Sequence, residues 1–160
     1  MGATVKKTCW LILFILAWPL GAGAWSGKIT GIIDGDSLRI MRPGFGEVEL
    51  RLYGIDAPEF KQAFGRAAKK HLASVLSRHM ATIKTFDRDK HGRSVVILWQ
   101  NGRNVNEIMV RDGYAWVYRR YCRESFCHDW LRFEKDARLK KLGLWQEEEP
   151  VPPWEFRHME

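Results

Sequence analysis

Alternating apolar and polar positions mark short strands along the chain. In Glu47–Tyr53, the apolar side chains Val48, Leu50 and Leu52 alternate with charged residues, as in a strand with one buried face. Similar runs predict four more strands, at Lys28–Ile33, Ser37–Arg42, Thr82–Phe86 and Ser94–Trp99. Turn signals separate several of these runs, namely Pro43-Gly44, the polar loop Asp87–Arg93 with its glycine, and Asn101-Gly102. The pattern therefore predicts a meander of short strands.

Three segments have the apolar spacing of helices. The longest, Gln62–Arg78, carries Ala63, Ala67, Leu72, Val75 and Leu76 and has no glycine after Gly65. Two further helices are predicted at Val105–Asp112, closed by Gly113, and at Asp129–Leu142, closed by Gly143. One helix inserted among five strands and two helices after them predict an α+β domain. A five-stranded OB-type β-barrel with three helices fits that order.

The first 24 residues follow a different pattern. Lys6 and Lys7 precede an apolar run, Cys9–Leu20, and Ala22-Gly23-Ala24 follows as an A-x-A cleavage site. A membrane-spanning helix needs about 20 apolar residues, whereas this run is shorter and is interrupted by proline and glycine. We therefore interpret residues 1–24 as a signal peptide rather than an anchor. We expect an exported protein, periplasmic or extracellular, with no membrane span after removal of the signal.

The rest of the chain suits one domain and a tail. A total of 160 residues with 8 tryptophans can fill a single core, and we assign that domain to residues 25–146. The tail, residues 147–160, starts with three acidic residues and continues with prolines, so we expect it to lie extended over the surface. We expect the mature protein to be a monomer.

The charge balance narrows the class of partner. Lysine and arginine outnumber aspartate and glutamate by 26 to 19, which gives a net charge of +7. Removal of residues 1–24 takes away two lysines and no acid, so the mature chain stays basic. A basic balance favours polyanionic partners, either nucleic acid or an anionic membrane surface, and does not separate the two.

Loss of the signal also leaves two of the three cysteines, Cys122 and Cys127. An even pair in an oxidising compartment suggests a disulfide. The alternative is a metal site that uses both thiols and His128. Such a site needs a fourth ligand, and the sequence has no second Cys/His cluster to provide it, so we favour the disulfide.

Three acids occupy positions that could carry chemistry. Asp36 starts one predicted strand, while Asp56 and Glu59 follow the end of the next. Because the start of one strand of a hairpin lies beside the end of its partner, Asp36 and Asp56 can converge in space. Clustered carboxylates with the backbone carbonyl of Ala57 would form an oxygen site suited to calcium or magnesium. Ordinary turn residues are the alternative, and spacing alone favours that alternative.

Two arginines are candidate phosphate-binding residues beside the three acids. Arg51 lies on the polar face of the strand that leads to Asp56, and Arg93 ends the glycine-containing loop. Guanidinium groups bind phosphate oxygens through two parallel hydrogen bonds. A metal ion, two arginines and a carboxylate that orients water form a set able to attack a phosphodiester. Taken singly, each arginine is equally consistent with the surface of a basic protein.

Each of five short motifs is weak evidence alone, but the five together, in this order, are highly specific for one type of protein. These are Asp34-Gly35-Asp36-Ser37, the run Arg51–Glu59 (RLYGIDAPE), the run Asp89–Arg93 (DKHGR), Val105-Asn106-Glu107 and Gly143-Leu144-Trp145. From about Gly31 to Trp145 the chain resembles the staphylococcal nuclease (thermonuclease) family. The tail segment Pro152–Arg157 also resembles one seen in exported bacterial members.

The resemblance implies a calcium-dependent endonuclease with an OB barrel and three helices. Its substrates would be DNA and RNA, cut with little sequence preference to leave 3′-phosphate ends. By the resemblance, Asp36 and Asp56 bind calcium with help from the Ala57 carbonyl. Glu59 positions or deprotonates the attacking water, and the arginines at 51 and 93 hold the phosphate.

The same resemblance places Lys90, His91 and Tyr121 near the bound nucleotide. His91 stands where the family often has tyrosine, so it either donates to phosphate or is a solvated loop histidine. Ser37 replaces the usual threonine and keeps its hydroxyl. Tyr121 fits one of the family's nucleotide-contacting tyrosines, while the other position falls on Arg119.

Two other functions remain as alternatives. A non-catalytic OB-fold module could bind nucleic acid without cutting it, and a peripheral membrane or cell-wall protein could use the basic surface. The complete set of Asp36, Arg51, Asp56, Glu59 and Arg93 favours an enzyme over both.

Overall fold

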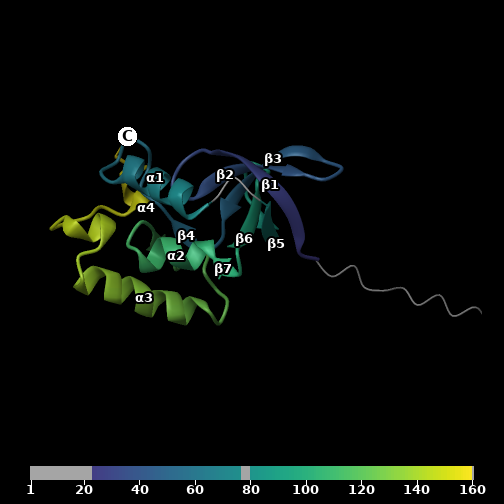
Figure 1. Ribbon diagram of the computed structural model, residues 1–160. Helices are drawn as coiled ribbons and strands as arrows, with labels where there is room; N and C mark the ends of the chain where they lie inside the picture. Colours follow the sequence, from purple (N-terminus) through teal and green to yellow (C-terminus); the bar gives the residue numbers. More distant parts are fainter. Residues whose placement is uncertain (1–22, 77–79, 160) are drawn as a thin grey trace, which may run out of the picture.

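A closed ring of five strands is the centre of the computed structural model, which describes residues 23–76 and 80–159 (Figure 1). The five strands are β1 (Trp25–Ile32), β2 (Ser37–Arg42), β3 (Gly46–Leu52), β5 (Met80–Arg88) and β6 (Ser94–Gln100). They follow the order β3-β2-β1-β5-β6 with antiparallel neighbours, and a parallel pairing of β3 with β6 closes the ring. This confirms the predicted OB-type barrel.

The alternation in the sequence fills the barrel. Leu38 and Ile40 of β2 are fully buried, and Leu38 pairs across the hairpin with the buried Leu50 of β3. Ile83 of β5 and Leu98 of β6 complete the same core from the opposite wall. Burial of a side chain of this size contributes about 1.5–3 kcal/mol, so the core fixes the strand ends on which the polar residues stand.

Three helices cover the barrel, as the sequence predicts, although the third starts two residues earlier and ends three residues earlier than the expected Asp129–Leu142. They are α1 (Gly65–Val75), α2 (Val105–Arg111) and α3 (Cys127–Leu139), and α2 lies between α3 and the barrel (Figure 1). The first helix starts three residues later than expected because a turn precedes it. In that turn Gln62 N–H donates to the Glu59 carbonyl and Gly65 N–H donates to the Gln62 carbonyl.

Short elements that the sequence pattern did not predict join these parts. They are the two-residue strands β4 (Ile55–Asp56), β7 (Arg103–Asn104) and β8 (Trp116–Val117), and the 3₁₀ helix η1 (Gly143–Gln146). Strand β4 pairs antiparallel with β8, so that Asp56 lies opposite Trp116. This small ladder fixes the backbone of Asp56 outside the barrel ring.

The C-terminal tail, which was expected to be extended, is partly helical. Its last part is not extended, because Pro153–Phe156 forms a short helix, α4. Proline is favoured in the first turn of a helix. Trp154 stacks on Tyr118 with ring centroids 5.1 Å apart, and Gln62 Nε2 donates to the Val151 carbonyl at 2.5 Å. The tail is therefore packed onto the domain.

Cys122 and Cys127 are both buried and are joined by a disulfide. The bond links the segment after β8 to the first residue of α3. Gly54 packs against it with φ 71°, and a Cβ at that position would lie 2.7 Å from the Cys122 sulfur. With both sulfurs in the disulfide, neither is a thiolate for the alternative metal site.

No helix within residues 23–76 or 80–159 is long and apolar enough to cross a membrane. The proposed signal peptide lies outside the described residues, except for Gly23 and Ala24.

Candidate active site

Asp36 stands in a tight turn at the start of β2. Its N–H donates to the Asp34 side chain at 2.9 Å, and its own Oδ2 accepts from Ala57 N–H at 2.6 Å. Gly35 allows this approach, because a Cβ there would lie 2.6 Å from the Cβ of Ala57. The turn before β2 is therefore in direct contact with the segment after β4.

Arg51 joins Asp36 and Asp56, the two acids expected from the sequence to converge. The β2–β3 register places Arg51 opposite Ser37, next to Asp36. Its Nη1 pairs with Asp36 Oδ1 and its Nη2 donates to Asp56 Oδ1 at 2.6 Å. Asp36 is 1% exposed and Asp56 is 0% exposed. Buried carboxylates require such pairing, because an unpaired charge away from water is strongly disfavoured.

A third arginine, which the sequence analysis did not identify, reaches the same acids. Arg157 follows α4, and its Nη2 donates to Asp56 Oδ2 at 2.8 Å. Its Nη1 donates to Glu59 Oε1 at 2.6 Å and lies 3.3 Å from Asp56 Oδ1. Burial alone would lower the pKa of Arg157, but the hydrogen bonds to Asp56 and Glu59 outweigh it and raise that pKa above its ordinary value. The available signal was a lone arginine after Pro152-Pro153-Trp154 in a mainly acidic tail.

Glu59 lies in the turn between β4 and α1. Its N–H donates to Gln62 Oε1 at 3.0 Å, which fixes the backbone of the turn. Its side chain is partly exposed and shares Arg157 with Asp56. The structure therefore brings Glu59 beside the two buried acids while leaving its carboxylate open to water.

Arg93 approaches from the β5–β6 loop. Its Nε donates to Asp89 Oδ2 at 2.7 Å, and its Nη1 lies 3.4 Å from Ser37 Oγ, beside Asp36. Burial raises the pKa of Asp89, but hydrogen bonds from Arg93 and from His91 N–H hold that pKa below its ordinary value. Asp89 therefore stays ionised and orients Arg93 toward the start of β2.

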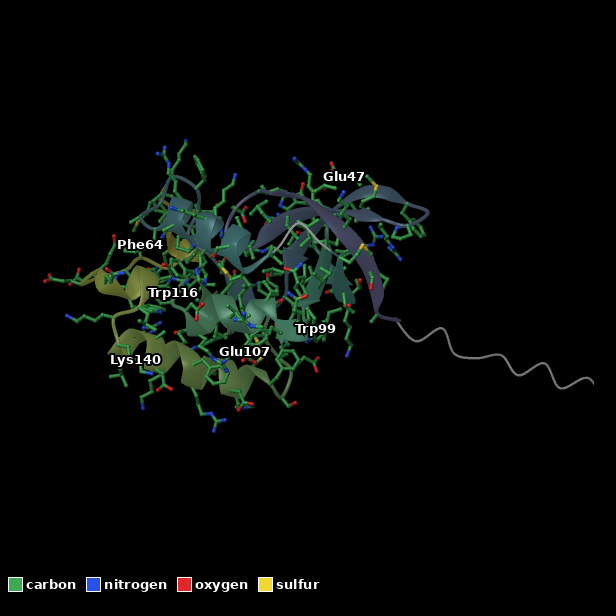
Figure 2. All side chains as sticks on the ribbon, viewed as in Figure 1. Glu47, Phe64, Trp99, Glu107, Trp116 and Lys140 are labelled. Carbon is green, nitrogen blue, oxygen red and sulfur yellow. A yellow bond between two sulfur atoms is a disulfide. The ribbon has the colours of Figure 1, made fainter. Side chains whose placement is uncertain are left out.

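The expected nucleotide-contacting residues are more exposed. Lys90 and His91 lie on the surface of the β5–β6 loop. Tyr121 is 52% exposed and its ring meets that of Tyr118 at 4.8 Å. Trp116, which Figure 2 labels, packs against Trp145 and Trp154, so it belongs to the core under the tail.

The donors around Asp36 suit a hard divalent cation. The carboxylates of Asp36 and Asp56 and the carbonyl of Ala57 are all oxygens, which calcium and magnesium prefer. The described residues contain no group of three or more His, Cys, Asp or Glu side chains that could hold a metal ion. A cation held by two carboxylates would therefore complete its shell with water and with oxygens of a ligand.

The chain is similar to a known protein family and to several individual proteins. The family described as "Staphylococcal nuclease homologue" matches residues 49–147. A protein named "Uncharacterized endonuclease" from Escherichia coli is 37% identical over 155 residues, covering 96% of this chain and 99% of its own. "Micrococcal nuclease" of Shigella flexneri is 32% identical over 97% of this chain and 92% of its own. "Staphylococcal-like nuclease CAN1" of Arabidopsis thaliana is 35% identical over 68% of this chain and 32% of its own.

Proposed function

The chain belongs to the family of staphylococcal nuclease homologues, and we propose that it is a calcium-dependent endonuclease acting on DNA and RNA. The relatives named as nucleases support a nucleic-acid hydrolase. The observation that carries the finer proposal is the pair of buried acids, Asp36 and Asp56, bridged by Arg51, with Glu59 beside them. Little sequence preference is expected, because contacts to phosphate carry no base information.

In this proposal Asp36, Asp56 and the Ala57 carbonyl hold the ion. Bound calcium would supply a positive charge that polarises a phosphate oxygen. Glu59, which water can reach, orients a water molecule and accepts its proton as the new P–O bond forms. The bond between phosphorus and the 5′ oxygen breaks and that oxygen takes up a proton from solvent, which leaves a 3′-phosphate on one product and a 5′-hydroxyl on the other.

The arginines act on the charge that grows at phosphorus. Arg51 has two nitrogens directed at the acids, and Arg93 lies next to Ser37, the residue that follows Asp36. Both guanidinium groups can therefore reach oxygens of a phosphate bound at the acids. Groups placed where charge develops stabilise the transition state more than the ground state.

Replacement of Arg51 by lysine tests this arrangement. Lysine keeps the charge but loses the fork that bridges two acids, so kcat should fall by about 10²–10³-fold. Steady-state cleavage of an oligonucleotide measures the change. Arg39→Lys is the matched control, because Arg39 is an exposed arginine on the neighbouring strand β2. A parent-like kcat for Arg51→Lys would remove Arg51 from the active site.

We also propose export after removal of residues 1–24. Strand β1 starts at Trp25, whose indole N–H donates to Thr85 Oγ1 at 3.4 Å, so cleavage before Trp25 keeps the barrel strands whole. Protein recovered from outside the cytoplasm should have Trp25 as its first residue, which N-terminal sequencing determines. Recovery of a membrane-embedded product that retains Met1 would contradict export.

A further inference from the structure

A groove of about 690 Å³ runs from Arg93 to the tip of the β2–β3 hairpin. Figure 2 labels Glu47 on this hairpin. The side chains that line the groove include Arg42, Phe45, Glu49, Arg88, His91 and Arg93. Cavities of roughly 300–1,000 Å³ bind small organic ligands, so the groove is large enough for a nucleotide.

An aromatic ring and a guanidinium form the outer end of the groove. Phe45 is 69% exposed at the hairpin tip. The Arg42 guanidinium lies 4.2 Å from the centroid of the Phe45 ring and 4.7 Å from that of Trp25. The exposed Phe45 ring, with the Arg42 guanidinium over it, suits stacking of a base because every base has a π-face.

The charge and the position of the groove favour nucleic acid as its occupant. Arg42, Arg88 and Arg93 outnumber the single acid, Glu49, among the charged lining residues. The inner end is Arg93, which also lies beside Ser37 and therefore beside Asp36. A nucleic acid whose phosphate is bound at the acids would thus continue into the groove.

We propose that this groove binds the nucleotide next to the scissile phosphate, with its base on Phe45 and its phosphate near Arg42 and Arg88. The proposal rests on the nuclease function proposed above. It makes Phe45 and Arg42 substrate-binding residues that take no part in the chemical step.

Steady-state kinetics of Phe45→Ala and Arg42→Ala on a single-stranded 12-mer test this site. Stacking on an aromatic ring stabilises a bound base, so Phe45→Ala should raise KM by about 10-fold and leave kcat unchanged, because uniform binding is lost. Arg42→Ala should raise KM and reduce its dependence on salt. Arg103→Ala removes the same charge from the exposed strand β7, which contributes no residue to the lining of the groove, and should match the parent.

A KM within two-fold of the parent for both variants would overturn the groove as a binding site. Loss of kcat with KM unchanged would also overturn it, since that result assigns the residues to the chemistry. A parent protein that does not cut the 12-mer would instead refute the proposed function.

Arg157 lies against Asp56, away from the groove residues, and supports a second, independent inference. Arg157 donates to both carboxylate oxygens of Asp56, which also pairs with Arg51. The tail that carries Arg157 is anchored by the buried Pro153 and by Trp154 on Tyr118. A divalent cation at Asp56 needs an oxygen that Arg157 occupies, and the two positive groups repel each other.

We infer that Arg157 competes with a divalent cation for Asp56, so that the protein's own tail opposes metal binding at this site. This inference also rests on the proposed metal-dependent function. Because charge-assisted hydrogen bonds are stronger than neutral ones, removal of those from Arg157 should strengthen metal binding by about 10-fold or more.

Calorimetric titration with calcium, in the absence of nucleic acid, tests the competition. Arg157→Ala should bind calcium about 10-fold more tightly than the parent, while Arg103→Ala, which removes a charge from exposed β7, should not. Calcium should also accelerate hydrogen exchange in the C-terminal peptide of the parent. Equal or weaker calcium binding by Arg157→Ala would overturn the inference, whereas calcium binding by neither protein would refute the metal site itself.

Discussion

Asp56→Asn is expected to lower cleavage at saturating nucleic acid by at least about 10³-fold, because a metal ion at phosphate supplies several kcal/mol. Asparagine keeps the shape of the side chain and one acceptor oxygen, but it removes the negative charge that would hold the cation. Calcium binding should fall together with the rate. Cleavage assays and calcium titrations of the same preparations measure both quantities.

Asparagine is a better substitution than alanine at these buried acids, because alanine would also remove the hydrogen-bond acceptors of neighbouring groups. Asp56 is fully buried and accepts hydrogen bonds from Arg51 and Arg157, so alanine would leave two guanidinium groups without their shared partner. Asp36→Ala would in addition leave Ala57 N–H without its acceptor. Each such loss costs about 1–3 kcal/mol of stability. Asp56→Asn with a folded far-UV spectrum and parent-like cleavage would show that Asp56 holds no essential ion.

Glu59→Gln is expected to have the second large effect on the rate of cleavage. A positioned general base contributes about 10²–10⁴-fold in rate, and glutamine is a much weaker base of the same size. The side chain is partly exposed and can still accept a hydrogen bond from Arg157. We therefore expect kcat to fall by about 10²–10⁴-fold with little change in affinity for nucleic acid. Turnover kinetics and a binding titration of the variant separate these two quantities.

Glu107→Gln is the matched control for this change. Glu107, labelled in Figure 2, also pairs with an arginine at 2.6 Å, but on the surface of α2. Its loss should leave kcat unaffected. A Glu59→Gln protein that turns over at the parent rate would exclude Glu59 from the chemical step, and equal losses in both variants would point to a general effect of charge.

The alternation of apolar and polar residues in the sequence was sufficient to predict the strands that are long enough to show it. Leu38 and Ile40 alternate with polar residues, and strand β2 has the predicted bounds. Asp36 and Asp56 could be placed together because each flanks an end of the same hairpin. The two-residue strands β4 and β8 could not be predicted, since two residues show no period.

The position of Arg157 could not be predicted for a different reason. Its contact with Asp56 joins residues 101 positions apart. It exists because Pro153, Trp154 and Tyr118 pack the tail onto the domain. A proline-rich sequence equally allows an extended tail, so the decision lies in tertiary packing rather than in the local sequence. The parallel closure of β3 against β6 is a long-range pairing of the same kind.

Cleavage of labelled DNA and RNA by the parent protein, with calcium and with an excess of chelator, tests the central claim most directly. We expect cutting of both nucleic acids in calcium, loss of cutting in chelator, and recovery when calcium is restored. Products should carry 3′-phosphate and 5′-hydroxyl ends, which mass spectrometry identifies. Cleavage at an undiminished rate in excess chelator, or none in calcium, would contradict the account.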